Sequence, residues 1–368
     1  MKFAEKKYNV LCALLSIAAF VSPAGSEPAS QEELAQLYQQ SFSLFQSLPY
    51  DGAYSYFRST PDGDRNTVVN VRQRSSQERK YEIVSPESLH GLVMFTNNEG
   101  FWGTSLSEDE RKKIEKDFHF LPLHFFFSRN DLNQETKLKF LLDNYSLSKE
   151  DNKEQIAGRK TFLIRIDPKN RYRHSYLIYL DDETKSLLKQ VIMDEEKKPV
   201  EKMEFQRIRF DEKLAQEPLS TENLVLIHPY RKDDRKEEKK EEKKEEKQND
   251  KKPCLNFSPL KIEWLPRGFQ MIGESIRGDG EKQTLHTVYS DGLAELSIFQ
   301  RKQTKEEKEE QEKEKRGDQV KLWEWRGRAI FFRDICGLRI TAIGDLPNSA
   351  LSRTLSQIPT LPENPEKK

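Results

Sequence analysis

The fold of this protein is decided by residues 160–210, which read KTFLIRIDPKNRYRHSYLIYLDDETKSLLKQVIMDEEKKPVEKMEFQRIRF. Four runs in this stretch are rich in β-branched and aromatic residues, as strands are: 160–167, 173–180, 186–193 and 200–210. The turns between them are short and polar, and such short links join antiparallel neighbours. In the first run Phe162, Ile164 and Ile166 alternate with Leu163 and Arg165, which is typical of a sheet with one face in water.

Residues upstream of this stretch predict a helix and further strands. Ser30 and Glu33 form a capping box, and Pro49 ends the helix that follows. The apolar residues of this helix recur at helical spacing: Leu34, Leu37, Tyr38, Phe42, Phe45 and Leu48. Strands are expected at 53–58, 67–73, 80–84 and 90–96, and a charged helix near 108–117. We therefore predict a large antiparallel sheet with a helix packed on it.

The distribution of charge divides the chain into domains. Among 368 residues, 62 are basic and 62 acidic, and this zero net charge argues against a protein that coats nucleic acid. Residues 231–252 hold 11 basic residues, 9 acidic residues and no apolar residue, so they cannot join a core. We predict a flexible linker there, between a domain at 27–230 and a smaller one at 253–358. Residues 359–368 are expected to be a disordered tail.

The second domain is predicted to be of mixed α+β type. Strands are expected at 260–264, 283–290, 293–300, 320–325, 328–333 and 337–343, and a last helix from Asn348 to Ile358. A charged insertion at 303–318 carries 12 charges in 16 residues. Its sequence fits either a short exposed helix or a long solvated loop.

The N-terminus has the plan of a secretory signal peptide. Lysines precede an apolar run at 10–21, and small residues follow it, so cleavage is expected after Ser26. The run is shorter than a membrane span needs, which predicts a soluble protein outside the cytoplasm. In that compartment Cys254 and Cys336 could form one disulfide, or they could be two separate thiols.

The chain lacks the common catalytic signatures. It has no Walker loop, HExxH, CxxC, GxSxG or dinucleotide fingerprint, and we predict no enzyme, no cofactor and no catalytic residue. His119 and His124 have a spacing compatible with metal ligation, but no third ligand lies near them in sequence, so we predict a packed pair and no metal.

The aromatic run FHFLPLHFFF at 118–127 has two interpretations. It can pack into the sheet. Alternatively, it can cover a half-open sheet and line a site for acyl chains or an apolar peptide. The residues that would line this site are Phe118, Phe120, Leu121, Leu123, Phe125, Phe126 and Phe127.

Several short stretches occur along the chain in the same order as in a known protein family. They are YDGAYSY at 50–56, IAGR at 156–159, IDP at 166–168, RYRHSYLIYLD at 171–181, SLL at 186–188, WLPRGF at 264–269 and YSDGLAELSIF at 289–299. This ordered set resembles the RseB/MucB family of periplasmic sigma-E regulators. The chain departs from the family pattern in its long linker, in the insertion at 303–318, and at Lys185, where the family usually has Gly in the turn.

The resemblance implies both a fold and a function. It implies a curved antiparallel half-barrel of the lipoprotein-carrier type, covered by helices and linked to a smaller α+β domain. It implies a periplasmic negative regulator that binds the periplasmic part of a membrane-anchored anti-sigma factor and protects it from proteolysis. Lipid or lipopolysaccharide would act as the effector of this envelope stress response.

The same resemblance suggests partner-binding residues in the second domain. These are Trp264, Arg267, Tyr289 and Asp291, although the turns that hold them can serve folding alone, which is the role such turns usually have. Two other functions remain open. A periplasmic lipoprotein or lipid carrier would share the half-barrel but would not need the second domain. An envelope enzyme of unrecognised type would need a cleft with convergent polar groups.

Overall fold

Helix α1 (Gln31–Ser47) is the first described element, and it lies where the capping box and Pro49 predict it. The computed structural model describes residues 29–60, 63–108, 133–151, 154–229, 255–313, 319–325 and 328–359. Chain contacts divide the protein into Met1–Ser30 and a compact unit, Gln31–Lys368, in which all the elements below lie. The predicted signal peptide, charged helix, linker and tail fall wholly or almost wholly outside the described residues.

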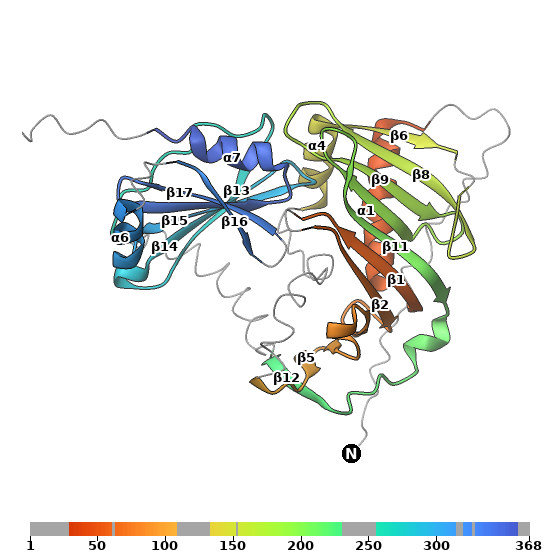
Figure 1. The fold of residues 1–368 in the computed structure, drawn as a ribbon. Coiled ribbons are helices and arrows are strands. Elements are labelled where there is room, and N and C mark those ends of the chain that lie inside the picture. The colour runs from red at the N-terminus through yellow and green to blue at the C-terminus, as the bar shows by residue number, and fades with distance from the viewer. Residues whose placement is uncertain are drawn as a thin grey trace, which may run out of the picture. The chain divides into compact units, whose positions relative to one another are not determined.

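A twelve-stranded antiparallel sheet follows α1 (Figure 1). Its strands are β1 (Tyr50–Arg58), β2 (Arg65–Gln73), β3 (Arg79–Ser85), β4 (Val93–Thr96), β5 (Gly100–Thr104), β6 (Tyr145–Glu150), β7 (Gln155–Ile156), β8 (Arg159–Pro168), β9 (Ser175–Asp181), β10 (Leu187–Met193), β11 (Pro199–Phe210) and β12 (Leu224–Pro229). The strand order is β12-β5-β4-β3-β2-β1-β11-β10-β9-β8-β6, and β7 pairs with β8. The sheet is open, and the predicted antiparallel class is confirmed.

The sequence predicted most of this sheet but not all of it. The four strands of residues 160–210 and the strands β1, β2 and β3 are confirmed. The strand expected at 90–96 begins only at Val93, because a 3₁₀ turn (η1, Glu87–Leu89) and a bend precede it. Strands β5, β6, β7 and β12 and the helix α4 (Gln134–Asn144) were not predicted. The alternation in β8 is incomplete, because Leu163 is buried as well.

Side chains of the sheet complete the backbone hydrogen bonds of α1. The core of the sheet includes Leu34 and Phe45 from this helix. The last turn of α1 has no basic residue, and its end carbonyls accept from the sheet instead. Gln73 Nε2 donates to the carbonyls of Phe45 and Leu48, at 3.0 and 2.7 Å, and Arg79 Nη2 donates to that of Gln46 at 3.0 Å. These bonds satisfy carbonyls that a helix end leaves open.

A second, six-stranded antiparallel sheet lies in the C-terminal part of the described chain (Figure 1). Its strands are β13 (Gln270–Arg277), β14 (Thr284–Ser290), β15 (Glu295–Lys302), β16 (Lys321–Trp325), β17 (Arg328–Ile335) and β18 (Leu338–Gly344), in the order β13-β14-β15-β18-β17-β16. A short 3₁₀ turn, η3 (Gly280–Lys282), joins β13 to β14. Helix α7 (Asn348–Ser356) packs on this sheet, as predicted, and buries Leu351 and Leu355 in its core.

One predicted strand of this sheet is wrong, and one was missed. Residues 260–264 have no regular structure. The amide of Gln300 pairs with the backbone of Leu260: Leu260 N donates to Oε1 at 2.8 Å, and Nε2 donates to the Leu260 carbonyl at 3.0 Å. A side chain thus takes the place of a neighbouring strand. The first strand of the sheet is β13 instead, which the sequence analysis did not predict.

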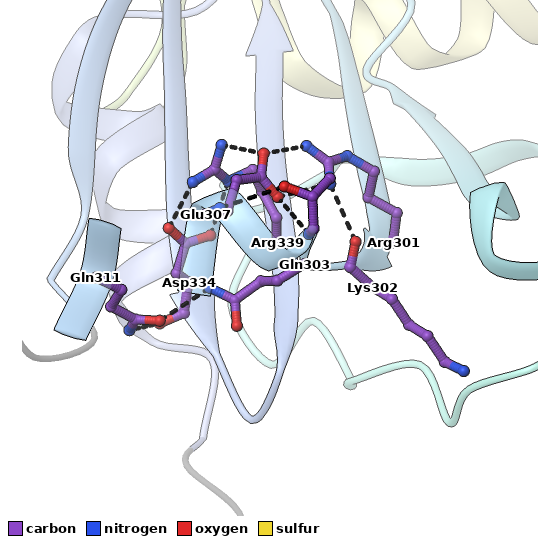
Figure 2. A network of polar contacts seen from close by, with 8 residues as sticks. Arg301, Lys302, Gln303, Glu307, Gln311, Asp334 and Arg339 are labelled. Carbon is purple, nitrogen blue, oxygen red and sulfur yellow. Dashed lines mark hydrogen bonds and ion pairs between the residues drawn. The ribbon is translucent and has the colours of Figure 1, made fainter. Parts of the chain in front are cut away.

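The charged insertion contains a helix, α6 (Lys305–Lys313), whose first turn is anchored to the six-stranded sheet (Figure 2). Thr304 and Glu307 form a reciprocal capping box, because each backbone N–H donates to the other residue's side chain. The Glu307 carboxylate also accepts from Arg301 at 2.8 and 2.6 Å and from Arg339. Arg339 in turn makes a bidentate pair with Asp334. Of the two predicted forms of the insertion, the helix is present at 305–313.

Candidate functional site

The candidate site is a buried polar cluster that joins the two sheets. Asp291 lies in the turn between β14 and β15, and its Oδ2 accepts from Arg173 Nε at 2.5 Å and from the Tyr145 hydroxyl at 2.9 Å. The side chains of Arg173 and Asp291 are both 0% exposed. The other carboxylate oxygen, Oδ1, accepts from the backbone N–H groups of Leu293 and Ala294, at 3.1 and 2.8 Å. Asp291 therefore shapes its own turn and binds the other sheet.

Arg173, just before β9, collects the remaining partners of the cluster. Its Nη2 donates to Asn144 Oδ1 at 3.3 Å and to the backbone carbonyl of Arg267 at 2.5 Å. Its guanidinium carbon lies 5.1 Å from the centre of the Phe269 ring. Asn144, at the end of α4, donates to the Asp291 carbonyl at 3.2 Å. Residues of both sheets are thus bound to one guanidinium.

Two glycines allow the backbones to approach this closely. Gly268 and Gly292 have φ of +94° and +95°, which other residues rarely adopt. A Cβ atom on Gly268 would lie 1.8 Å from Asn144 Oδ1, and one on Gly292 would lie 2.6 Å from Phe140 Cβ. The glycines of the PRGF and SDGL stretches are therefore required by the junction between the sheets.

The cluster is an ion pair from which water is excluded, because the side chains of Arg173 and Asp291 are both fully buried. Burial raises the pKa of Tyr145 well above its ordinary value, and the Asp291 carboxylate raises it further. The hydroxyl therefore stays protonated and donates to that carboxylate. Because the pair is fully buried, its chemistry is structural: it satisfies two charges that would otherwise be costly to bury.

A second group of side chains lies beside helix α7. The Trp264 ring meets the Tyr172 ring edge-on, with centroids 5.1 Å apart. The Arg353 guanidinium lies 4.7 Å from the Trp264 ring centre and also donates to the Tyr172 hydroxyl. Glu195 accepts from Ser349 Oγ of α7 at 3.0 Å and from the Tyr172 backbone N–H at 3.1 Å. These contacts add a second polar connection between the two sheets.

The four residues suggested for partner binding are thus placed in different surroundings. Asp291 is fully buried in the cluster, and Arg267 contributes its backbone carbonyl to it. Trp264 lies in the neighbouring aromatic group, while Tyr289 packs on the core of the six-stranded sheet. Their partner-binding role stays a prediction. Asn144 and Tyr145 were not predicted as site residues, and Arg173 lies in a stretch that resembles the family but had no predicted role.

The proposed ligand-lining residues and one of the two cysteines lie outside the described part of the chain. Residues 109–132 are not described, and these include the aromatic run at 118–127 and both of the histidines considered for metal. Cys336 is exposed in the turn between β17 and β18, whereas Cys254 is not described, so their disulfide stays a prediction.

Two further observations concern only the residues that the structure describes. No group of three or more His, Cys, Asp or Glu side chains is arranged to hold a metal ion among them. Within the same residues, every helix is too short or too polar to cross a membrane.

Comparison with known families gives two matches in chain order. The sequence model of the MucB/RseB N-terminal domain matches residues 129–223, and that of the MucB/RseB C-terminal domain matches residues 256–359. Together they cover more than half of the chain. The protein belongs to the MucB/RseB family. Arg173 lies in the first matched region and Asp291 in the second, so the buried cluster joins the two family domains.

Individual relatives in the MucB/RseB family agree with this assignment. The sigma-E factor regulatory protein RseB of Haemophilus influenzae is 25% identical over 206 residues, 56% of this chain. The match spans 57% of that relative's length. The MucA/MucB complex of Pseudomonas aeruginosa matches with a TM-score of 0.56 and 12% identity, covering 88% of this chain and 96% of that chain. MucB in complex with MucA(peri) gives a TM-score of 0.54 and 13% identity over the same shares.

Proposed function

We propose that this protein is a non-enzymatic regulator of a sigma-E-type envelope stress response, and that it acts in the periplasm after its signal peptide is removed. It binds the periplasmic part of a membrane-anchored anti-sigma factor. The observation that carries the proposal is that both MucB/RseB domains are matched in order, on a fold shared with MucB solved in complex with MucA.

Binding would protect the anti-sigma factor by occupying the segment that a protease must reach. A lipid or lipopolysaccharide effector would then act by linkage. If the lipid weakens the affinity for the anti-sigma segment by some factor, that segment weakens lipid binding by the same factor. The aromatic run at 118–127 is the proposed lining for the lipid, since its phenylalanines offer a large apolar surface.

A binding and protection experiment tests the proposal. The protein from residue 27 onward is mixed with the periplasmic region of the anti-sigma factor encoded beside its sigma factor, and affinity is measured by calorimetry. The periplasmic protease that cleaves that region is then added. We expect saturable binding and slower cleavage. The absence of binding, or cleavage at an unchanged rate, would contradict the proposed function.

The lipid step needs its own variant. Phe126→Asp places a charge in the proposed lining, and Phe126→Leu keeps the position apolar. We expect the first variant to lose binding of lipopolysaccharide in a folded protein and the second to retain it. Equal lipid binding by both variants would remove 118–127 from the site.

The alternative of a periplasmic lipid or lipoprotein carrier is less well supported. A carrier would use the twelve-stranded sheet alone. In this chain the six-stranded sheet matches a MucB/RseB domain in its own right and is bound to the larger sheet through Asp291. A carrier would be identified by lipid transfer between vesicles without any anti-sigma partner.

A further inference from the structure

The two sheets have four edge strands among the described residues, apart from the two-residue strand β7. The twelve-stranded sheet ends at β12 and β6, and the six-stranded sheet ends at β13 and β16. Each edge strand presents backbone N–H and C=O groups that can pair with another chain, and proteins usually block such edges. The four edges differ in how they are blocked.

Three of the edges carry an identifiable obstacle. At β6 the Gln31 side chain pairs with the backbone of Leu147, accepting from its N–H at 2.7 Å and donating to its carbonyl. At β12 the register shifts between Leu226 and His228, and the strand ends at Pro229, which has no N–H. At β13 the register shifts between Met271 and Gly273. Bulges of this kind twist an edge away from a straight partner.

Strand β16 differs from these three edges. Its pairing with β17 is continuous, from Lys321 opposite Phe332 to Trp325 opposite Arg328. Leu322 is 48% exposed and Trp323 is 56% exposed. Because neighbouring side chains in a strand point to opposite faces, these two residues flank the edge on both sides. An edge strand without a register shift, with exposed apolar side chains on both faces, is suited to receive another strand.

We propose that β16 receives an extended segment of the anti-sigma factor as a seventh strand of this sheet, an inference that rests on the proposed function. The segment would gain backbone hydrogen bonds from the edge and place alternate apolar side chains against Trp323 and Leu322. Its flanks would be acidic, because Lys321 begins β16 and Arg328 lies opposite the other end of this strand, whereas Glu324 is the one acidic residue of the strand.

A matched pair of variants tests this edge. Trp323→Glu puts a charge on β16, and Met271→Glu puts the same charge at a 59% exposed position on the opposite edge of the same sheet. We expect Trp323→Glu to weaken binding of the anti-sigma periplasmic region by about tenfold or more, which is the loss that truncation of a buried aromatic anchor typically causes. We expect the second to change it by less than about twofold, as peripheral contacts do. Thermal unfolding of both variants shows whether the fold is retained.

A second readout follows the backbone in the unmodified protein. Amide hydrogen exchange of residues 321–325 should slow when the anti-sigma region binds, because the edge N–H groups become hydrogen-bonded. This measurement does not depend on the folding of a variant. Unchanged exchange in β16 at saturation would overturn the proposal.

The remaining outcomes are distinguishable. If the unmodified protein does not bind the anti-sigma region, the proposed function itself fails. If it binds and Trp323→Glu binds equally well, the function stands and the β16 proposal is overturned. Two other results for Trp323→Glu also overturn it. If the variant loses only binding to phosphatidylethanolamine–phosphatidylglycerol vesicles, β16 meets a lipid surface. If the variant only dissociates from a dimer to a monomer, β16 meets a second copy of the chain.

Discussion

Substitution of Asp291 by asparagine should destabilise the protein far more than its conservative chemistry suggests. The carboxylate lies 2.5 Å from Arg173 Nε, and both side chains are fully buried. Among the described residues, Arg173 Nη1 is buried without a hydrogen-bond partner, and the salt bridge of Arg173 there is the one with Asp291. Breaking a buried pair of this kind costs about 3–5 kcal/mol, a large share of the roughly 5–15 kcal/mol by which proteins are stable.

A double-mutant cycle by urea denaturation measures this effect. Arg173→Met removes the other charge, and we expect the double variant to recover most of the loss, because replacing both members of a buried pair is often nearly neutral. Asp143→Asn is the control. It makes the same substitution in the exposed Lys139–Asp143 pair of α4, where we expect less than about 1 kcal/mol.

A small loss of stability in Asp291→Asn would contradict the prediction. If Asp291→Asn costs no more than Asp143→Asn, water reaches the pair in solution and the junction between the sheets is not closed. If the double variant is no more stable than the worse single variant, the two side chains do not act as a pair.

Three further predictions concern other parts of the fold. Lys185 has φ of +59° in the turn where the family usually has Gly, so Lys185→Gly should be more stable than Lys185→Val by about 1–2 kcal/mol in thermal or urea unfolding; equal stabilities would contradict this. Burial lowers the pKa of His174, although the Met193 carbonyl and the carboxylates of Asp345 and Glu201 oppose it. The unfolded state therefore takes up the proton first, and stability should fall as the pH drops below about 6.5, with a flatter profile in His174→Gln; identical profiles would count against it. Finally, Glu307→Gln should cost about 1–3 kcal/mol because it weakens the anchor of α6, whereas the exposed Glu310→Gln should cost almost nothing; a similar small loss in both would show that α6 is not anchored.

The elements that could be predicted are those in which the spacing of apolar residues shows which side chains are buried. The period of two in β8 and the period of 3.6 in α1 are local patterns, and the structure confirms both elements. Strand β13 could not be predicted in this way, because its sequence, QMIGESIR, mixes polar and apolar residues on an exposed edge. Residues 260–264 were predicted as a strand and form none: their sequence is apolar enough, but the Gln300 side chain pairs with the N–H and carbonyl of Leu260, where a neighbouring strand would pair.

The candidate site could be predicted only in part. The sequence analysis singled out the PRGF and SDGL stretches as similar to the family, and in the structure their glycines and Asp291 form the junction between the sheets. Asp291 makes its contacts within the chain, with Arg173 and Asn144, which are more than a hundred residues away in sequence. Spacing along a sequence carries no information about such a pairing, so partner binding and structural support could not be separated beforehand.

The sequence by itself determined the antiparallel class, the positions of most strands along the chain, the uneven charge and the family resemblance, because each of these depends on residues close together in the chain. Only the tertiary structure decided that Arg173 and Asp291 form a buried pair, that Glu307 anchors the charged insertion, and that β16 is an edge strand without a register shift and with exposed apolar side chains. The physical reason is the same in each case. Burial and pairing are set by groups distant in sequence, and their free energy depends on whether water is excluded between them.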